Sequence, residues 1–257
     1  EDAGIQVISA NTDGIISKIP RWMEDTYSEI LNDWQDRTGF NMEFTDYKGV
    51  YSRDVNSYIA VTTKGKVKTK GAYSMGAISN NPQTEIAIEA AINHLTGKKS
   101  IISTIKECND VRKFITLRTV NGGAIWPVIA TEYEDGTTEY RESPDIKNGM
   151  YLGKAIRWYY AKDVTWNIHY KKPTKSGNHN RVPKTEGAKP IMEFKNTPKS
   201  KIVMVDGKPT NPYCLPDDLD YAWYMRKAYD ILTEVGYETD PYFVLKKNRK
   251  KEEVDVE

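Results

Sequence analysis

Residues 6–19, QVISANTDGIISKI, decide how the front of the chain folds. Two short runs rich in β-branched residues, 5–10 and 14–19, flank the sequence Asn-Thr-Asp-Gly, and this arrangement is typical of a β-hairpin. Because both runs are strongly apolar, we expect them to lie in the buried centre of a sheet. The hairpin would then hold the carboxylate of Asp13 rigidly at its tip.

The carboxylate of Asp13 has two explanations. Asp and Asn side chains satisfy backbone amides in turns, so Asp13 fits ordinary turn chemistry. A rigidly held carboxylate is also what a metal site needs, and Mg²⁺ binds through one or two carboxylates together with substrate phosphates. The residues alone leave both explanations open.

The rest of the front indicates an α+β fold. A helix is expected between Pro20 and Gly39, with strands at 41–45 and 47–51 and a hairpin across 57–73 that turns at Lys64-Gly65. The residues at helical spacing that form the apolar face of the helix are Met23, Tyr27, Ile30, Leu31 and Trp34.

The composition changes near SNNPQT, residues 79–84, which predicts a domain boundary. We expect helices at 84–96 and 100–114, short strands and turns at 115–170, and a basic, turn-rich segment at 171–189. A further helix is expected within 215–237, capped by Asp217 or Asp218. The predicted domains are therefore 1–80 and 81–240, followed by a charged, disordered tail at 241–257.

Composition limits the function. The formal net charge is only +1, so any surface that binds a polyanion must come from local patterning. The two cysteines, Cys108 and Cys214, match no disulfide or zinc spacing, which indicates reduced thiols and a cytoplasmic protein. No apolar run approaches the ~20 residues of a membrane helix, so no membrane partner is expected. The first residues, EDAG, lack a Met, which suggests a fragment or a processed product.

A row of lysines is the clearest local charge pattern. Side chains alternate between the faces of a strand, so Lys66, Lys68 and Lys70 are expected on one face, ~6.6–6.8 Å apart. Such a row could contact the phosphates of a nucleic acid without reading its bases. The alternative is an edge strand whose lysines prevent aggregation.

The segment ISANTDGII, residues 8–16, resembles motif C of family B DNA polymerases, a hairpin usually written Tyr-Gly-Asp-Thr-Asp-Ser. Asp13 takes the place of the second Asp, and Asn11 takes the place of the first. The resemblance implies that Asp13 is a catalytic ligand of a two-magnesium site. Asn11 would be a weaker, uncharged ligand in that site.

Two later segments are similar to primer-binding elements of the same family. VNSYIAV, residues 55–61, places Tyr58 at the tyrosine of a Lys-x-Tyr element, with Asn56 in place of its lysine. KGKVKTKGAY, residues 64–73, resembles the Lys-x-Lys-Gly strand. The resemblance implies that Tyr58, Lys66, Lys68 and Lys70 hold primer–template DNA.

Four segments, 104–124, 151–161, 181–192 and 215–237, resemble in order the thumb of phage-type family B polymerases. The chain would then be a partial palm, with antiparallel hairpins and a packed helix, followed by a mixed helical and β thumb that binds duplex DNA. Basic residues of the thumb become candidates for DNA contacts, although each fits a solvated surface equally well: Arg112, Lys113, Lys154, Arg157, Arg181, Lys184 and Lys189.

In this family motifs A and B and the exonuclease precede motif C, and residues 1–257 contain none of them. The resemblance therefore implies a partner, an N-terminal polymerase part carrying motifs A and B, and deoxynucleoside triphosphates as substrates of the complete enzyme. Alone, the chain is expected to be inactive. A phage-encoded enzyme would act in the bacterial cytoplasm. The rival interpretations are a non-catalytic, sequence-independent DNA-binding accessory protein and a structural protein with incidental lysines.

Overall fold

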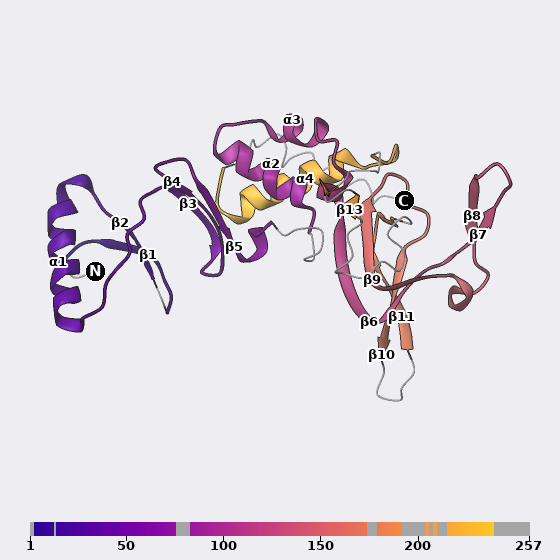
Figure 1. The fold of residues 1–257 in the computed structure, drawn as a ribbon, viewed down its shortest axis with the longest axis horizontal. Helices are drawn as coiled ribbons and strands as arrows, with labels where there is room; N and C mark the ends of the chain where they lie inside the picture. The colour runs from indigo at the N-terminus through magenta and orange to yellow at the C-terminus, as the bar shows by residue number, and fades with distance from the viewer. Residues whose placement is uncertain are drawn as a thin grey trace, which may run out of the picture. The chain divides into compact units, whose positions relative to one another are not determined.

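The structure is a computed structural model that describes residues 3–12, 14–75, 83–173, 179–191, 204–205, 208–209 and 215–238. For 171–173, 179–185, 204–205 and 208–209 only the backbone is described. The chain forms two compact units, Glu1–Ser74 with Glu234–Tyr237, and Met75–Thr233 with Glu238–Glu257. Figure 1 shows a few helices and several antiparallel sheets, so the fold class is α+β.

The predicted hairpin at the front of unit 1 is confirmed. Strand β1 (Gln6–Ala10) pairs antiparallel with β2 (Ile15–Lys18). The expectation that these strands are buried is wrong, because Ile8 is 46% exposed and Ile15 is 59% exposed. Within the described residues neither strand pairs with a third, and a two-stranded ribbon leaves both faces open.

The predicted helix is also present. A 3-10 turn, η1 (Arg21–Met23), leads into α1 (Glu24–Thr38), which ends at Gly39 with φ of 72°. The predicted apolar face remains largely uncovered: Met23 is buried, but Ile30 and Trp34 are 42% and 40% exposed, and no residue of α1 itself is buried. The sequence pattern therefore identified the helix without showing whether anything covers it.

The strand expected at 41–45 is absent. The chain returns along α1 instead, where the Met42 N–H donates to Gln35 Oε1 at 2.8 Å and the ring of Phe40 stacks on Trp34 at 6.0 Å. The first of these contacts occupies the Met42 N–H, which a strand would have used for pairing.

A three-stranded antiparallel sheet completes unit 1. Its order is β3 (Tyr47–Asp54), β4 (Ser57–Thr62) and β5 (Val67–Lys70), followed by the 3-10 turn η2 (Gly71–Tyr73). The turn between β4 and β5 lies at Lys64-Gly65 as predicted, with φ of 78° at Gly65. Strand β4 is central, and Ile59 and Ala60 are both fully buried.

Unit 2 begins with helices. α2 (Glu85–Leu95) and α3 (Ile101–Lys106) match the predicted starts, and the side chain of Ser100 accepts the Ser103 N–H at 3.0 Å as an N-cap. The second helix is shorter than expected. After Lys106 the chain turns, and a separate 3-10 helix, η3 (Val111–Phe114), starts where the Asp110 side chain accepts the Arg112 N–H.

The centre of unit 2 is a five-stranded antiparallel sheet in the order β11-β10-β6-β9-β12. Two strands of 11 residues, β6 (Thr116–Trp126) and β9 (Met150–Tyr160), run side by side, so the expectation of short strands was wrong for these two. The segment expected to be turn-rich contains β10 (Ile168–Pro173), β11 (His179–Thr185) and β12 (Ala188–Pro190). Buried Trp126, Trp158 and Tyr170 belong to the core of the sheet.

Smaller hairpins accompany this sheet. β7 (Val128–Glu132) pairs with β8 (Thr138–Glu142), and β13 (Met204–Val205) pairs with β14 (Lys208–Pro209). Figure 1 shows β7 and β8 as a separate ribbon.

The last described helix is α4 (Tyr221–Glu234), and its buried residues are Tyr224, Ala228, Ile231 and Leu232. The predicted cap was wrong by two or three positions: Asp220 accepts the Trp223 N–H at 3.0 Å. No helix in the described part of the chain is long and apolar enough to cross a membrane. The predicted tail at 241–257 and Cys214 lie outside the described residues.

Candidate nucleic-acid interface

The tip of the first hairpin is closed by one backbone hydrogen bond, from the Asn11 N–H to the Gly14 carbonyl oxygen at 2.9 Å. Asn11 and Gly14 are exposed, and Asp13 lies outside the described residues. Among the residues that are described, no three His, Cys, Asp or Glu side chains gather closely enough to hold a metal ion. The magnesium site therefore stays a prediction.

The sheet of unit 1 presents what we call the lysine face, consisting of Tyr58, Lys66, Lys68 and Lys70. In the β4–β5 ladder Lys70 is directly opposite Tyr58, and Lys68 is opposite Ala60. Opposed residues of an antiparallel pair share a face. Tyr58 and the lysines therefore lie on the same side of the sheet, although 12 positions separate Tyr58 from Lys70.

The lysines of this face are free to meet an external anion. All three are exposed, whereas Val67 and Thr69 between them are half-buried, as the predicted alternation requires. Within the described part of the chain none of the three has a carboxylate at ion-pair distance. The Lys68 ammonium lies 5.8 Å from the ring centre of Tyr47, a cation–π contact that leaves its charge intact.

The end of the lysine face is fixed by a close backbone approach. Gly71 follows Lys70 with φ of 62°, and a Cβ there would overlap the carbonyl oxygen of Asn56 and lie 2.6 Å from Ser57 Oγ. The Ser57 hydroxyl oxygen also accepts the Ala72 N–H at 3.3 Å. Only a glycine allows this contact, which holds the start of β4 and the end of β5 together.

Tyr73 anchors the turn that follows. It is 2% exposed, and its hydroxyl donates to Glu234 Oε2 at 3.1 Å. The Arg53 guanidinium lies 5.9 Å from the centre of the same ring. Burial, reinforced by the hydrogen bond to Glu234, raises the pKa of Tyr73 to about 12.

Several cations predicted to contact DNA in unit 2 already have anionic partners. Arg112 donates to both carboxylate oxygens of Asp110, at 2.8 and 2.6 Å, and Lys113 pairs with Glu89 at 2.6 Å. Burial alone would raise the pKa of Asp110, but its hydrogen bonds with Arg112 outweigh burial and hold that pKa below its usual value. The pairing reduces the charge that Arg112 and Lys113 offer to a phosphate.

Lys189 is likewise engaged. Its ammonium pairs with Asp218 Oδ2 at 2.5 Å, and the other oxygen of Asp218 accepts the Tyr159 hydroxyl at 2.8 Å. Burial favours a higher pKa for Asp218, but these two partners lower it. The pair ties β12 to the segment before α4, which is a structural role for Lys189.

The two candidates on β9 differ. Lys154 is exposed, but Arg157 is only 4% exposed and lies within the sheet opposite Leu117. Burial lowers the pKa of Arg157. Lys154 is therefore open to solvent, whereas Arg157 is not placed to contact a polyanion outside the protein.

Arg181 and Lys184 lie in β11, for which only the backbone is described. Arg181 occupies the register position opposite Lys171 of β10. Two basic residues thus occupy opposed register positions of β10 and β11, in a segment that the sequence predicted to be basic.

Unit 2 contains an aromatic stack that no motif in the sequence predicted. Tyr160, at the end of β9, stacks on Trp223 of α4 with ring centres 3.4 Å apart and planes 9° apart. The residues are 63 positions apart in a chain rich in Tyr and Trp, and only the fold selects this pair. In the sequence, the abundance of Tyr and Trp was the one feature that could have indicated such a stack.

A comparison with solved structures gives a distant similarity. The structure resembles that of the family B DNA polymerase from the hyperthermophilic archaeon Pyrobaculum calidifontis, with 13% sequence identity and a TM-score of 0.41. The match covers 93% of this chain and 27% of the polymerase, so the chain spans about a quarter of that protein's length. No protein-family model matches the sequence, and no curated protein matches it. Because the TM-score is low, our proposals rest on the residues of this chain.

Proposed function

We propose that this chain binds the sugar–phosphate backbone of DNA through the lysine face. The observation that carries the proposal is the row of exposed Lys66, Lys68 and Lys70, which have no carboxylate partner within the described residues. Their expected spacing of ~6.6–6.8 Å suits successive phosphates of one strand. Binding of this kind is independent of sequence and weakens with salt.

Tyr58 adds a specific element to this surface. It is half-buried in β4 and lies opposite Lys70, so its position relative to the lysines is set by the strand ladder. A phenol hydroxyl can donate to a phosphate oxygen. An edge strand that only had to resist aggregation would need the lysines but would not need a tyrosine beside them.

We propose further that the chain is the C-terminal palm and thumb part of a phage-type family B DNA polymerase. The motif C resemblance around Asp13, followed in order by the Tyr58 and lysine elements, supports this proposal. Asp13, with Asn11 beside it, would join a second metal-binding aspartate, which motif A of an N-terminal part carrying motifs A and B would supply. Two bound Mg²⁺ ions would then assist the addition of deoxynucleotides to a primer 3′ end.

A two-part assay tests these proposals. Binding of primer–template DNA is measured against salt, and primer extension is measured with and without a chain carrying motifs A and B. We expect salt-dependent binding by this chain alone and extension only in the mixture. Asp13→Ala should abolish extension without weakening binding.

Each other outcome has a defined meaning. Binding without extension in any mixture would favour the DNA-binding accessory protein. Extension by this chain alone would refute its dependence on motifs A and B. Absence of salt-dependent binding would leave only the structural interpretation.

A further inference from the structure

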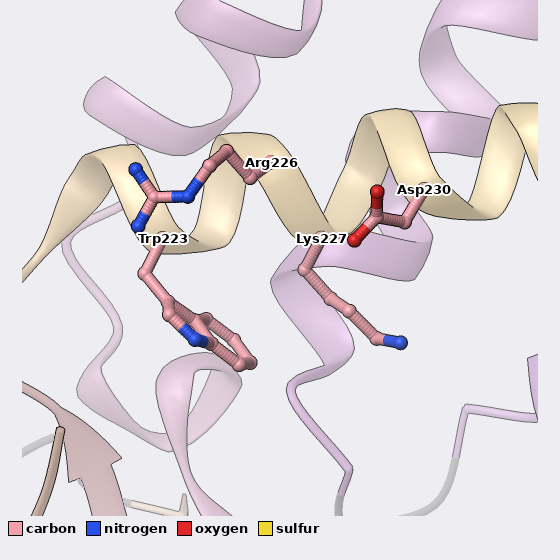
Figure 2. Close-up of a pocket in the computed structure, with 4 residues that line it drawn as sticks. All are labelled: Trp223, Arg226, Lys227 and Asp230. Carbon is pink, nitrogen blue, oxygen red and sulfur yellow. The ribbon is translucent and has the colours of Figure 1, made fainter. Parts of the chain in front are cut away.

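Helix α4 carries an aromatic platform that the lysine face does not explain. Trp223 stacks on Tyr160 nearly face to face, with planes 9° apart. Tyr160 can cover only one face of the indole. Trp223 also lines a hollow of about 110 Å³ together with Arg226, Lys227 and Asp230 (Figure 2).

Hydrogen bonds hold the platform in place. The Tyr160 N–H donates to the Tyr224 hydroxyl oxygen at 2.9 Å, and that hydroxyl donates to the Phe114 carbonyl oxygen at 2.8 Å. The Asp220 N–H donates to the Tyr160 carbonyl oxygen at 3.0 Å, and the Asp220 side chain caps the Trp223 N–H. The indole is therefore positioned before any ligand arrives, which lowers the entropic cost of binding.

The polar groups of the hollow have both signs. Figure 2 shows Trp223 and Lys227 extending from the same side of α4, one helical turn apart. Arg226 lies 3.6 Å from Asp220. Lys227 has no ion pair or hydrogen bond within the described part of the chain.

A flat ring beside a cation suits a nucleotide. A base can stack on the indole and its phosphate can meet Lys227, whereas Arg226 is already paired with Asp220. A phosphate without a base would leave the indole unused. An aromatic ring without a phosphate would leave Lys227 unused.

We propose that this hollow binds one unpaired base of single-stranded DNA together with an adjoining phosphate. The inference rests on the proposed function, because it takes DNA as the ligand of the chain. It adds a second mode of contact, stacking, which needs a base that is not paired in a duplex.

Fluorescence anisotropy of the full chain tests the proposal with two labelled oligonucleotides of equal length. One is a thymidine strand, and the other carries abasic sites, so that its phosphates remain but its bases are missing. We expect the thymidine strand to bind about tenfold more tightly, since one stacked base contributes this order of affinity. Trp223→Ala should remove that difference, and Trp223→Phe should restore part of it.

Two further variants separate stacking from charge and from folding. Lys227→Gln should weaken both oligonucleotides and lower the salt slope by about 0.7. Trp22→Ala is the matched control, because Trp22 is 81% exposed and lies in unit 1, so the base-dependent difference should persist. Circular dichroism of each variant reports whether α4 stays folded.

The outcomes distinguish this inference from the proposed function. If both oligonucleotides bind equally to the native chain, or if folded Trp223→Ala keeps the tenfold difference, the stacking site is refuted. Salt-dependent binding of primer–template would still stand in those cases. If the chain binds no DNA of any kind, both proposals fall together.

Discussion

Lys70 lies directly opposite Tyr58 across the β4–β5 ladder. The two residues come from two separate segments that the sequence analysis singled out as candidate DNA-binding elements. One segment surrounds Tyr58, and the other contains the row of lysines. The ladder joins them on one face, and Gly71 fixes where that face ends. The antiparallel pairing of β4 with β5, and not closeness in sequence, therefore brings the residues of the candidate interface together.

Replacing Lys66, Lys68 and Lys70 together by Gln should flatten the salt dependence of DNA binding. Each lysine that meets a phosphate contributes about 0.9 to the slope of log affinity against log salt, so the slope should fall by about 2.7. Equilibrium titrations at several salt concentrations measure it. The matched control changes three exposed lysines elsewhere, Lys98, Lys106 and Lys147, and should leave the slope nearly intact. Equal effects of the two triple variants would show that binding is not localised to the lysine face.

Gly71→Ala should destabilise unit 1 by more than about 2 kcal/mol, because the new Cβ combines a left-handed backbone with an overlap at Asn56. Gly65→Ala is the matched control. Gly65 also has a positive φ, of 78°, but no atom lies within 4 Å of the position that its new methyl group would take, so only about 1 kcal/mol should be lost. Denaturant unfolding measures both. Equal losses would contradict the importance of the close approach.

The pair Lys189 and Asp218 should matter for stability and not for DNA binding. Their side chains are 37% and 34% exposed, so solvent screening limits the coupling between them to about 0.5–1 kcal/mol. A double-mutant cycle with Lys189→Gln and Asp218→Asn measures that coupling. Lys189→Gln should leave the salt slope unchanged, whereas Lys68→Gln should lower it by about 0.9. A lower salt slope of DNA binding for Lys189→Gln would instead indicate that Lys189 contacts DNA.

Stability should fall as the pH rises from 10 to 12, in part because of Tyr73. The folded pKa of about 12 lies above the ordinary value of 10.0, so the unfolded chain loses the phenol proton first. The stabilisation by neutral Tyr73 is therefore complete below pH 10 and is lost as the pH approaches 12. Thermal unfolding of Tyr73→Phe should show a smaller decline over this range than the native chain. An identical decline in both would contradict the raised pKa.

Local patterns in the sequence predicted the elements that depend on local chemistry. The hairpin of β1 and β2, the helix end at Gly39 and the Lys64-Gly65 turn all lie where their residue types placed them. Each depends on interactions within a few residues, and such interactions can be inferred without the fold.

Burial and pairing could not be inferred in the same way. The apolar runs of β1 and β2 suggested a buried sheet, but burial depends on which other elements cover them. The basic residues Arg112, Lys113 and Lys189 suggested a binding surface, but their acidic partners become apparent only in three dimensions. The segment 171–189 suggested turns because its polar composition hid the pairing of β10 with β11 and of β12 with β9.

The exposed isoleucines of the first hairpin have a consequence for sequence variation. Ile8 and Ile15 contribute little to the stability of this chain, since water reaches about half of each residue. If selection acted only on the folding of this chain, polar residues could replace Ile8 and Ile15. If related sequences nevertheless retain large apolar residues at both positions, the pressure must come from a surface that covers the hairpin in the working protein.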